Sequence, residues 1–491
     1  MSSLRQKAAS GAAWTSLQQL GTVGIRMVLQ ILLARIISPE DFGLFGLILI
    51  FNAIGKTLSD AGMGQSLIRS NRLTEKDYGT VFLLNLSVSV LVYLLIFIGA
   101  PWVAEIYQRP VLTDLIRIYA LVVILSSFST IQIYRLQKLL KFKQQALIQL
   151  PSLVISSCIG IYLAYQDFGV WALVWMEVAL AALLALQFWI FTSWRPQILF
   201  DTRAFREHFN FGYKLLFAGL LDSIFMNIYP MVIGKFASIA QVGYFTRAFT
   251  LQSVPVMMIM SALGQVTYPV LAEVKEDRIR LKAIYRKMLQ LALFVIAPLM
   301  LLLAIMAKPL IVLLITDVWL PAVPYFQLLC LAGILFPLHV YNLNMLKVLG
   351  RSDLFLKAEF YKKILGIVIL FVTAPFGIMM MLYGILAASV LSLLINQYFS
   401  SLVFNYSNKE QTLDSLKIIW PALLVAGIVF FANQWVDYSP GAMNYFLHIL
   451  LLNFVFIGLY TFAQYVFNPL IYREMKQILL NFKIKPKKNN I

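Results

Sequence analysis

The sequence predicts an all-helical protein that crosses a membrane about fourteen times. Of its 491 residues, 60% are hydrophobic and only 13% are charged. Apolar stretches close to the twenty residues that a helix needs to cross a bilayer recur along the whole chain, and no segment between them is polar enough to form a soluble domain. Because lipid offers no partners to backbone N–H and C=O groups, and because the stretches are too long for barrel strands, we expect helices.

The predicted spans are bounded by charges, prolines or glycines. They cover roughly residues 11–34, 42–63, 79–101, 113–134, 147–165, 169–191, 211–234, 242–265, 287–307, 321–346, 358–375, 378–403, 416–435 and 444–467. This spacing predicts three parts: an N-terminal lobe of six helices (1–200), a second lobe of six helices (201–406), and two extra helices with a basic tail (407–491).

A repeat supports the two lobes. The stretch Gly11 to Ile68 returns about 200 residues later as Gly212 to Leu271. In each copy a cation precedes a short polar turn that ends in glycine: Arg35 before Gly43, and Lys235 before Gly243. Six spans separate the copies, an even number, so both copies enter the membrane in the same direction. We therefore expect lobes related by a pseudo-two-fold axis along the membrane normal, with a cavity between them. Chance similarity between two apolar hairpins is the alternative.

The cations indicate the orientation. The net charge is +18, and the Lys and Arg residues cluster in every second loop. The alternate loops hold only Arg35, Arg109, Lys235 and Lys308. The positive-inside rule then places both termini in the cytoplasm, and it explains the charge more simply than nucleic-acid binding does.

Polar residues inside the predicted spans are the candidate binding residues. A charged side chain at the centre of a span needs a partner, water or a function. Arg26 and Gln30 lie on one face of the first span, and Asn52, Lys56 and Asp60 lie on one face of the second. The corresponding spans of the second copy carry Asp222 and Arg247. We expect these side chains to line a hydrated, cationic cleft.

Two alternatives stay open for these charges. Lys56 and Asp60 are four residues apart and are able to pair with each other, and Arg26 is able to serve packing alone. Glu177 and His339, inside the sixth and tenth spans, are candidates for coupling to an ion, while a lone histidine is more often a hydrogen-bonded core residue.

Enzymatic signatures are missing from the sequence. It contains no G-x-x-x-x-G-K-[ST] loop and no nucleophile with a base at motif spacing. Cys158 and Cys330 lie inside apolar runs, and the histidines at 208, 339 and 448 are too scattered for a metal cluster. We therefore expect a protein without catalysis, metal or cofactor.

Several stretches resemble the polysaccharide transporter family, which belongs to the multidrug/oligosaccharidyl-lipid/polysaccharide exporter superfamily. They are Ala9 to Trp14, Leu33 to Gly43, Asp60 to Gly64, Arg135 to Phe142 and Ala237 to Tyr244. The resemblance implies a flippase of the bacterial inner membrane for undecaprenyl-diphosphate-linked repeat units of O-antigen, capsule or exopolysaccharide. It implies two six-helix bundles with alternating access, and a possible polysaccharide polymerase as partner.

The resemblance also implies roles for individual residues. Arg26, Lys56 and Arg247 lie on the first, second and eighth helices, which carry cavity cations in the related peptidoglycan-precursor flippase. The turns with Arg35, Asp41, Gly43, Lys235 and Gly243 would form an outer gate. The alternatives are a drug or organic-cation antiporter of the same superfamily, a membrane glycosyltransferase or ligase, and a scramblase or structural partner of a polymerase.

Overall fold

The computed structural model describes residues 2–70, 73–197, 199–435, 441–469, 471–474 and 477. Its regular elements over these residues are all helices, and helices occupy each of the fourteen predicted spans. Twelve segments of the described chain are long and apolar enough to cross a membrane. The chain is thus an all-α polytopic membrane protein, as predicted. Most of the predicted basic tail lies outside the described residues.

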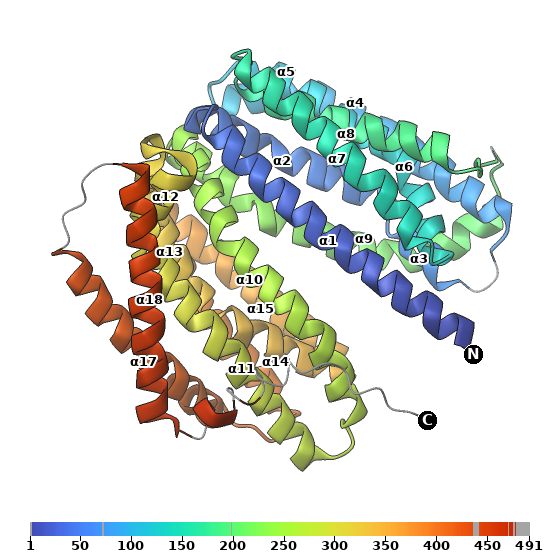
Figure 1. Ribbon diagram of the computed structural model, residues 1–491. Helices are drawn as coiled ribbons and strands as arrows, with labels where there is room; N and C mark the ends of the chain where they lie inside the picture. The colour runs from blue at the N-terminus through green and yellow to red at the C-terminus, as the bar shows by residue number, and fades with distance from the viewer. Residues whose placement is uncertain are drawn as a thin grey trace. The chain divides into compact units, whose positions relative to one another are not determined.

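The chain forms two compact units, Met1–Thr246 and Arg247–Ile491. In the first unit, long helices lie side by side (Figure 1). Its helices are α1 (Ser2–Ala34), α2 (Pro39–Asp60), α3 (Met63–Arg69), α4 (Glu75–Ile106), α5 (Val111–Tyr119), α6 (Leu121–Lys138), α7 (Phe142–Tyr165), α8 (Val170–Phe191), α9 (Thr202–Phe236) and the beginning of α10 (Ile239–Glu273).

Local sequence explains where α2 begins and ends. The Ser38 hydroxyl accepts a hydrogen bond from the Asp41 N–H, and Pro39 occupies the first turn, where its missing N–H costs nothing. At the other end Ala61 and Gly62 adopt left-handed backbone angles, with φ of +46° and +67°. This break turns the chain from α2 into the short helix α3.

Helix α9 packs against that break. A Cβ atom on Gly212 would lie 2.4 Å from the carbonyl oxygen of Ala61, so the two backbones touch where a side chain has no room. Farther along, the Thr57 and Ser223 hydroxyls are 3.0 Å apart. Contacts therefore join α9 to the N-terminal helices, although the repeat counts it as the first helix of the second copy.

A buried histidine strengthens the same contact. His208 on α9 is completely buried. Its Nδ1 lies 2.8 Å from the Ser66 hydroxyl on α3, and its Nε2 lies 3.2 Å from Asp77 Oδ1 on α4. Both ring nitrogens are satisfied, as a buried imidazole requires. His208 thus ties three helices together at one end of the unit.

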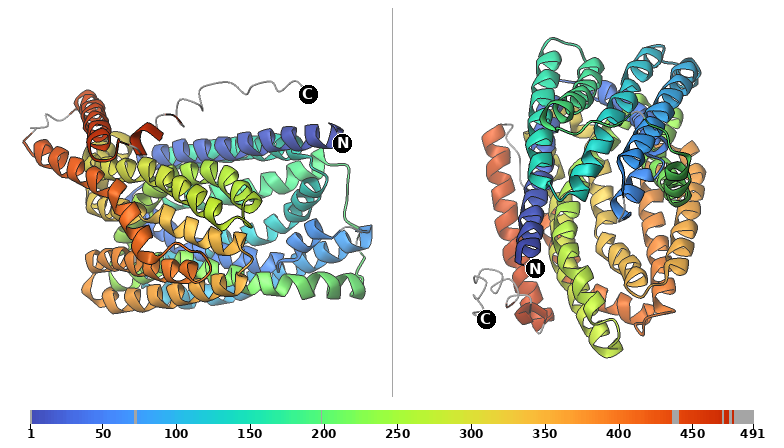
Figure 2. Two further views of the ribbon diagram at one scale, coloured as in Figure 1. Left: turned by 90° about the horizontal axis from the view of Figure 1, so that it is seen from below. Right: turned by 90° about the vertical axis from the view of Figure 1, so that its right-hand side faces the viewer.

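In the second unit the long helices also run side by side, and two further views confirm this arrangement for each unit (Figure 2). Its elements after α10 are α11 (Arg278–Ile305), α12 (Ala307–Ile315), η1 (Asp317–Ala322), α13 (Val323–Gly333), α14 (Phe336–Val348), α15 (Ser352–Thr373), η2 (Ala374–Phe376), α16 (Ile378–Ser401), α17 (Asn408–Asn433) and α18 (Ala442–Phe467).

The single helix predicted over 321–346 is wrong in detail. The structure divides it into η1, α13 and α14, with a break at Ile334 and Leu335. Pro337 lies in the first turn of α14, where the absent N–H of a proline is tolerated. The segment as a whole is apolar enough for one membrane span, so its hydropathy predicts a single helix.

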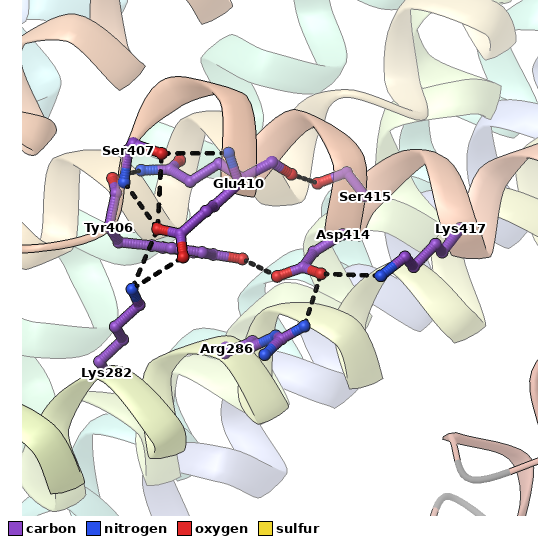
Figure 3. Close-up of polar contacts among 9 residues, drawn as sticks. Lys282, Arg286, Tyr406, Ser407, Glu410, Asp414, Ser415 and Lys417 are labelled. Atoms are coloured by element: carbon purple, nitrogen blue, oxygen red, sulfur yellow. Dashed lines mark hydrogen bonds and ion pairs between the residues drawn. The ribbon is translucent and has the colours of Figure 1, made fainter.

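A network of charges fastens α17 to α11 (Figure 3). Asp414 on α17 is buried; it accepts a hydrogen bond from the Arg286 guanidinium at 2.6 Å and another from the Tyr406 hydroxyl at 2.8 Å. One turn away, Lys282 donates to Glu410 at 3.0 Å. The extra pair of C-terminal helices is therefore attached to the second unit by paired charges as well as by apolar contacts.

We expect Asp414→Asn to lower the melting temperature of the purified protein. The substitution removes the charge that Arg286 and Tyr406 face, and hydrogen bonds to a charged group each contribute about 1.5–3 kcal/mol. Glu410→Gln is the matched control, because its carboxylate is half exposed and the amide keeps a hydrogen-bond acceptor near Lys282. Thermal unfolding in detergent measures both. Equal melting temperatures for the two variants would contradict a special role of Asp414.

Candidate functional site: a polar cavity in the first unit

The first unit contains a polar cavity of about 520 Å³. Its walls come from α2, α3, α4, α6, α8 and α9 and from the link between α2 and α3. Most of its polar side chains are neutral hydroxyls and amides, while Lys56 and Asp60 bring one charge of each sign. Five aliphatic side chains complete the lining: Val123, Ile133, Leu184, Leu215 and Leu216. Charged and polar groups inside a membrane protein need a partner, water or a ligand, so the polar part of this lining is a candidate binding surface.

A second charged group lies close to this cavity. Arg26 Nη1 on α1 is 3.3 Å from Glu177 Oε1 on α8. Lys56 on α2 interacts electrostatically with both of them. We call Arg26, Lys56 and Glu177 the charged triad. It contains two cations and one carboxylate, so it keeps a net positive charge.

The structure brings together residues that the sequence analysis treated separately. Glu177 was predicted as an ion-coupling residue, whereas Arg26 and Lys56 were predicted to bind substrate. Arg26 and Glu177 are 151 residues apart in sequence. No periodicity within one helix relates them, and they become neighbours only through helix packing, in which α1 lies against α7 and α7 against α8.

Of the two other residues predicted on the second span, Asp60 lines the cavity and Asn52 does not. Asn52 is buried and donates a hydrogen bond to the Tyr119 hydroxyl at 3.1 Å. Asp60 lines the cavity, and its Oδ1 has no hydrogen-bond partner among the described atoms. The charged groups that act on Lys56 are Glu177 and Arg26, and among the described residues no ion pair joins Lys56 to Asp60.

The remaining candidates from the first and second copies lie on three helices. Gln30 is half-buried on α1, and Asp222 is exposed on α9. Arg247 is half-buried on α10, at the first position of the second unit. Their role in substrate binding stays a prediction.

The two glycine turns of the repeat touch each other. A Cβ atom on Gly43 would lie 1.8 Å from the carbonyl oxygen of Ile239, and one on Gly243 would lie 1.9 Å from that of Pro39. The first turns of α2 and α10 therefore meet backbone to backbone, and only glycine permits this approach. Both glycines belong to the first compact unit.

Polar contacts surround the meeting point. Asp41 accepts a hydrogen bond from the Ser38 hydroxyl at 2.8 Å, and Lys235 donates to the carbonyl of Ile106 at 3.0 Å. Arg35 is exposed. Sequence reasoning missed the ion pair between Arg109 and Glu40, 2.7 Å long, which joins the neighbouring loop to the first turn of α2.

His339 lies in the second unit within a hydrogen-bond network. Its Nε2 is 3.1 Å from the Ser389 hydroxyl, and its Nδ1 is 3.0 Å from the Asn396 amide nitrogen. Both partners lie on α16. This is the arrangement that the hydrogen-bonded core interpretation expects, and ion coupling by His339 stays a prediction.

Sequence reasoning also missed the neutral side of the cavity. Asn85 on α4 and four hydroxyl residues of α6 line it: Ser126, Ser127, Ser129 and Thr130. The available signal was the density of hydroxyls within one apolar span. Such hydroxyls commonly bond to the backbone of their own helix, so composition alone does not separate a binding wall from ordinary packing.

Comparison with known proteins places this architecture in a family. A family model described as polysaccharide biosynthesis protein matches residues 32–324. The teichuronic acid biosynthesis protein TuaB of Bacillus subtilis (strain 168) is 28% identical over 359 residues, which are 72% of this chain and 74% of TuaB. The succinoglycan biosynthesis transport protein ExoT of Rhizobium meliloti (strain 1021) is 25% identical over 341 residues, 69% of each chain.

Solved structures show the same fold. The lipid II flippase MurJ, in an inward closed conformation, is similar with a TM-score of 0.74. The similarity covers 95% of this chain and 100% of that chain, at 14% sequence identity. The family model alone matches more than half of the sequence. The chain therefore belongs to the polysaccharide biosynthesis protein family.

Proposed function

We propose that this protein is a flippase that moves lipid-linked oligosaccharides from the cytoplasmic to the outer leaflet of the bacterial inner membrane. The carrier lipid would be a polyprenyl diphosphate such as undecaprenyl diphosphate. The observation that carries the proposal is the charged triad beside a polar cavity, in a family whose relatives include a polysaccharide transport protein.

The chemistry of the triad suits a diphosphate. Arginine offers a planar fork of N–H donors to phosphate oxygens, and lysine offers a compact charge. Arg26 and Lys56 keep a net positive charge because only Glu177 opposes them. Inside a membrane this charge is screened less than in water, so it attracts an anionic head group strongly.

The mechanism requires no bond to form or break. The head group would enter from the cytoplasmic leaflet while the prenyl chain stays in lipid, and the two units would then change their exposure to the two membrane faces. The contact between the Gly43 and Gly243 turns supports an outer gate that is closed in this conformation. Both termini would lie in the cytoplasm, and a polysaccharide polymerase would use the product outside.

Reconstitution tests this function. The purified full-length chain is placed in liposomes with fluorescent lipid-linked oligosaccharide from the cell that makes the protein, and an impermeant quencher reports how much substrate occupies each leaflet. We expect substrate from the inner leaflet to become quenched faster than in protein-free liposomes, because transport brings it to the leaflet that the quencher reaches. Movement of an organic cation instead, with no movement of the lipid-linked glycan, would favour a drug antiporter.

A further inference from the structure

One wall of the cavity has a different chemistry from the charged triad. Asn85 on α4 and Ser126 and Thr130 on α6 line it. Ser126 and Thr130 are four residues apart, so they lie on one face of α6, and both are half-buried. We call these three residues the hydroxyl-amide wall. All three side chains are neutral.

The hydrogen bonds of the wall leave acceptors for a ligand. The Thr130 hydroxyl donates to the carbonyl of Ser126 at 2.8 Å, so its proton is used while its oxygen lone pairs remain available. The Asn85 side chain is only 2% exposed, and its Oδ1 has no hydrogen-bond partner in the described structure. A buried amide without a partner is costly, and a bound ligand that donates a hydrogen bond would remove that cost.

Asp60 on α2, close to Tyr134 of α6, adds a further acceptor to the cavity lining. Its Oδ1 is buried and has no hydrogen-bond partner among the described atoms. The Tyr134 hydroxyl lies beside it. The cavity therefore presents several acceptors, together with amide and hydroxyl donors, around a space of about 520 Å³.

We propose that the hydroxyl-amide wall is a subsite for the glycan of the lipid-linked substrate, while the charged triad, whose Lys56 lines the same cavity, attracts the diphosphate. This inference rests on the proposed function. Sugar hydroxyls donate and accept hydrogen bonds, and they match neutral acceptors and donors better than a diphosphate does. An ionised diphosphate has no proton to give to Asn85 Oδ1 or to Asp60.

The volume agrees with this assignment. The cavity falls within the range of about 300–1,000 Å³ that small-molecule sites occupy. A cavity of this size has room for a few sugar units of a glycan and not for a long polymer. The wall would therefore contact the sugars nearest the diphosphate, while the rest of the repeat unit extends beyond the cavity.

The test compares two ligands and two kinds of variant. The full-length chain in lipid nanodiscs is titrated with polyprenyl diphosphate and with the same carrier bearing the repeat unit of the cell that makes the protein. We expect the wild type to bind the glycan-bearing carrier at least tenfold more tightly. The double variant Asn85→Leu, Thr130→Val should lose most of this preference and keep its affinity for the bare carrier.

Thr373→Val is the matched control. Thr373 on α15 also donates to the carbonyl four residues earlier at 2.8 Å and is also partly buried, but it lies outside the cavity. It should keep the full preference for the glycan. Asn85→Leu alone should melt at the wild-type temperature or higher, because it removes an unpartnered amide. This readout separates loss of binding from loss of folding.

Each outcome has a distinct meaning. Equal binding of both carriers by the wild type would overturn the subsite alone. The same is true if the double variant keeps the glycan preference, or if it loses affinity for both carriers equally. If neither carrier binds the wild type, the proposed function itself fails.

Discussion

Arg26→Gln is expected to reduce transport of the lipid-linked glycan at least tenfold, whereas Glu177→Gln should leave it unchanged or faster. Arg26 and Glu177 form one ion pair, 3.3 Å long. If Arg26 binds the diphosphate, its loss removes an attractive charge from the substrate. The loss of Glu177 removes a competitor of the substrate and leaves Arg26 in place. The effects therefore have opposite signs.

A purely structural ion pair predicts a different result. Removing either partner would then cause similar damage, because both variants break the same contact. The pair is partly exposed, with Arg26 43% and Glu177 16% accessible, so its contribution to stability is about 1 kcal/mol or less. A large loss of transport in Arg26→Gln without a change in melting temperature would therefore reflect binding rather than folding.

Arg351→Gln is the matched control for Arg26→Gln. Arg351 also forms an ion pair, with Asp353 at 2.8 Å, and its side chain is 46% exposed. It precedes α15 and does not line the cavity. We expect normal transport from this variant, measured in the same liposome assay. If Arg26→Gln and Glu177→Gln lose transport equally, the proposal that Arg26 binds the substrate is contradicted.

Gly243→Val is also expected to reduce transport at least tenfold, but by blocking a conformational step and not by weakening substrate binding. Any Cβ atom at this position would lie 1.9 Å from the carbonyl oxygen of Pro39, which is far inside contact distance. The first turns of α2 and α10 would then be unable to meet. If their contact is the closed outer gate, the variant keeps the outer end of the cavity open, and the cycle stops there.

Cysteine labelling measures whether the outer gate is open or closed. Ser126 lines the cavity, so Ser126→Cys reports its accessibility once the exposed Cys158 has been replaced by serine. An impermeant maleimide added outside should label this cysteine faster when Gly243→Val is present. Gly24→Val is the control, because a Cβ atom there meets nothing within 4 Å. If Gly243→Val changes neither the labelling rate nor transport, the contact between the two glycine turns is not an outer gate.

The two variants also separate binding from conformational change. Arg26→Gln should weaken binding of polyprenyl diphosphate and leave the labelling rate of the cavity cysteine unchanged. Gly243→Val should change the labelling rate and leave binding of the carrier largely intact. A variant that altered both readings would show that the charged triad and the glycine turns act as one element.

Much of the fold is predictable because lipid imposes strict requirements. A span needs about twenty apolar residues, and its backbone must satisfy its own hydrogen bonds, so length and hydropathy locate the helices. The glycine turns at Gly43 and Gly243 were also visible, since the repeat marks both. The break between α13 and α14 was not, because the segment as a whole is apolar enough to form one span.

The candidate site was predictable only in part. A charge inside a span is conspicuous because it is costly there, so Arg26, Lys56 and Glu177 were recognised individually. Their association was not recognised, since contacts between α1, α2 and α8 depend on how the helices pack. Neutral residues such as Asn85 and Thr130 cost much less free energy inside a span, so the sequence does not single them out. Only the cavity that they line identifies them as candidates.

By itself, the sequence determined that the chain is a helical membrane protein with paired glycine turns and with charges inside its spans. Hydropathy and charge act residue by residue along the chain, so they can be read without knowing which helices are neighbours. Only the tertiary structure decided that Glu177 opposes Arg26, that His208 holds α9 against α3 and α4, and that neutral side chains form one wall of a cavity. These contacts join residues that are far apart in sequence, and only helix packing brings such residues together.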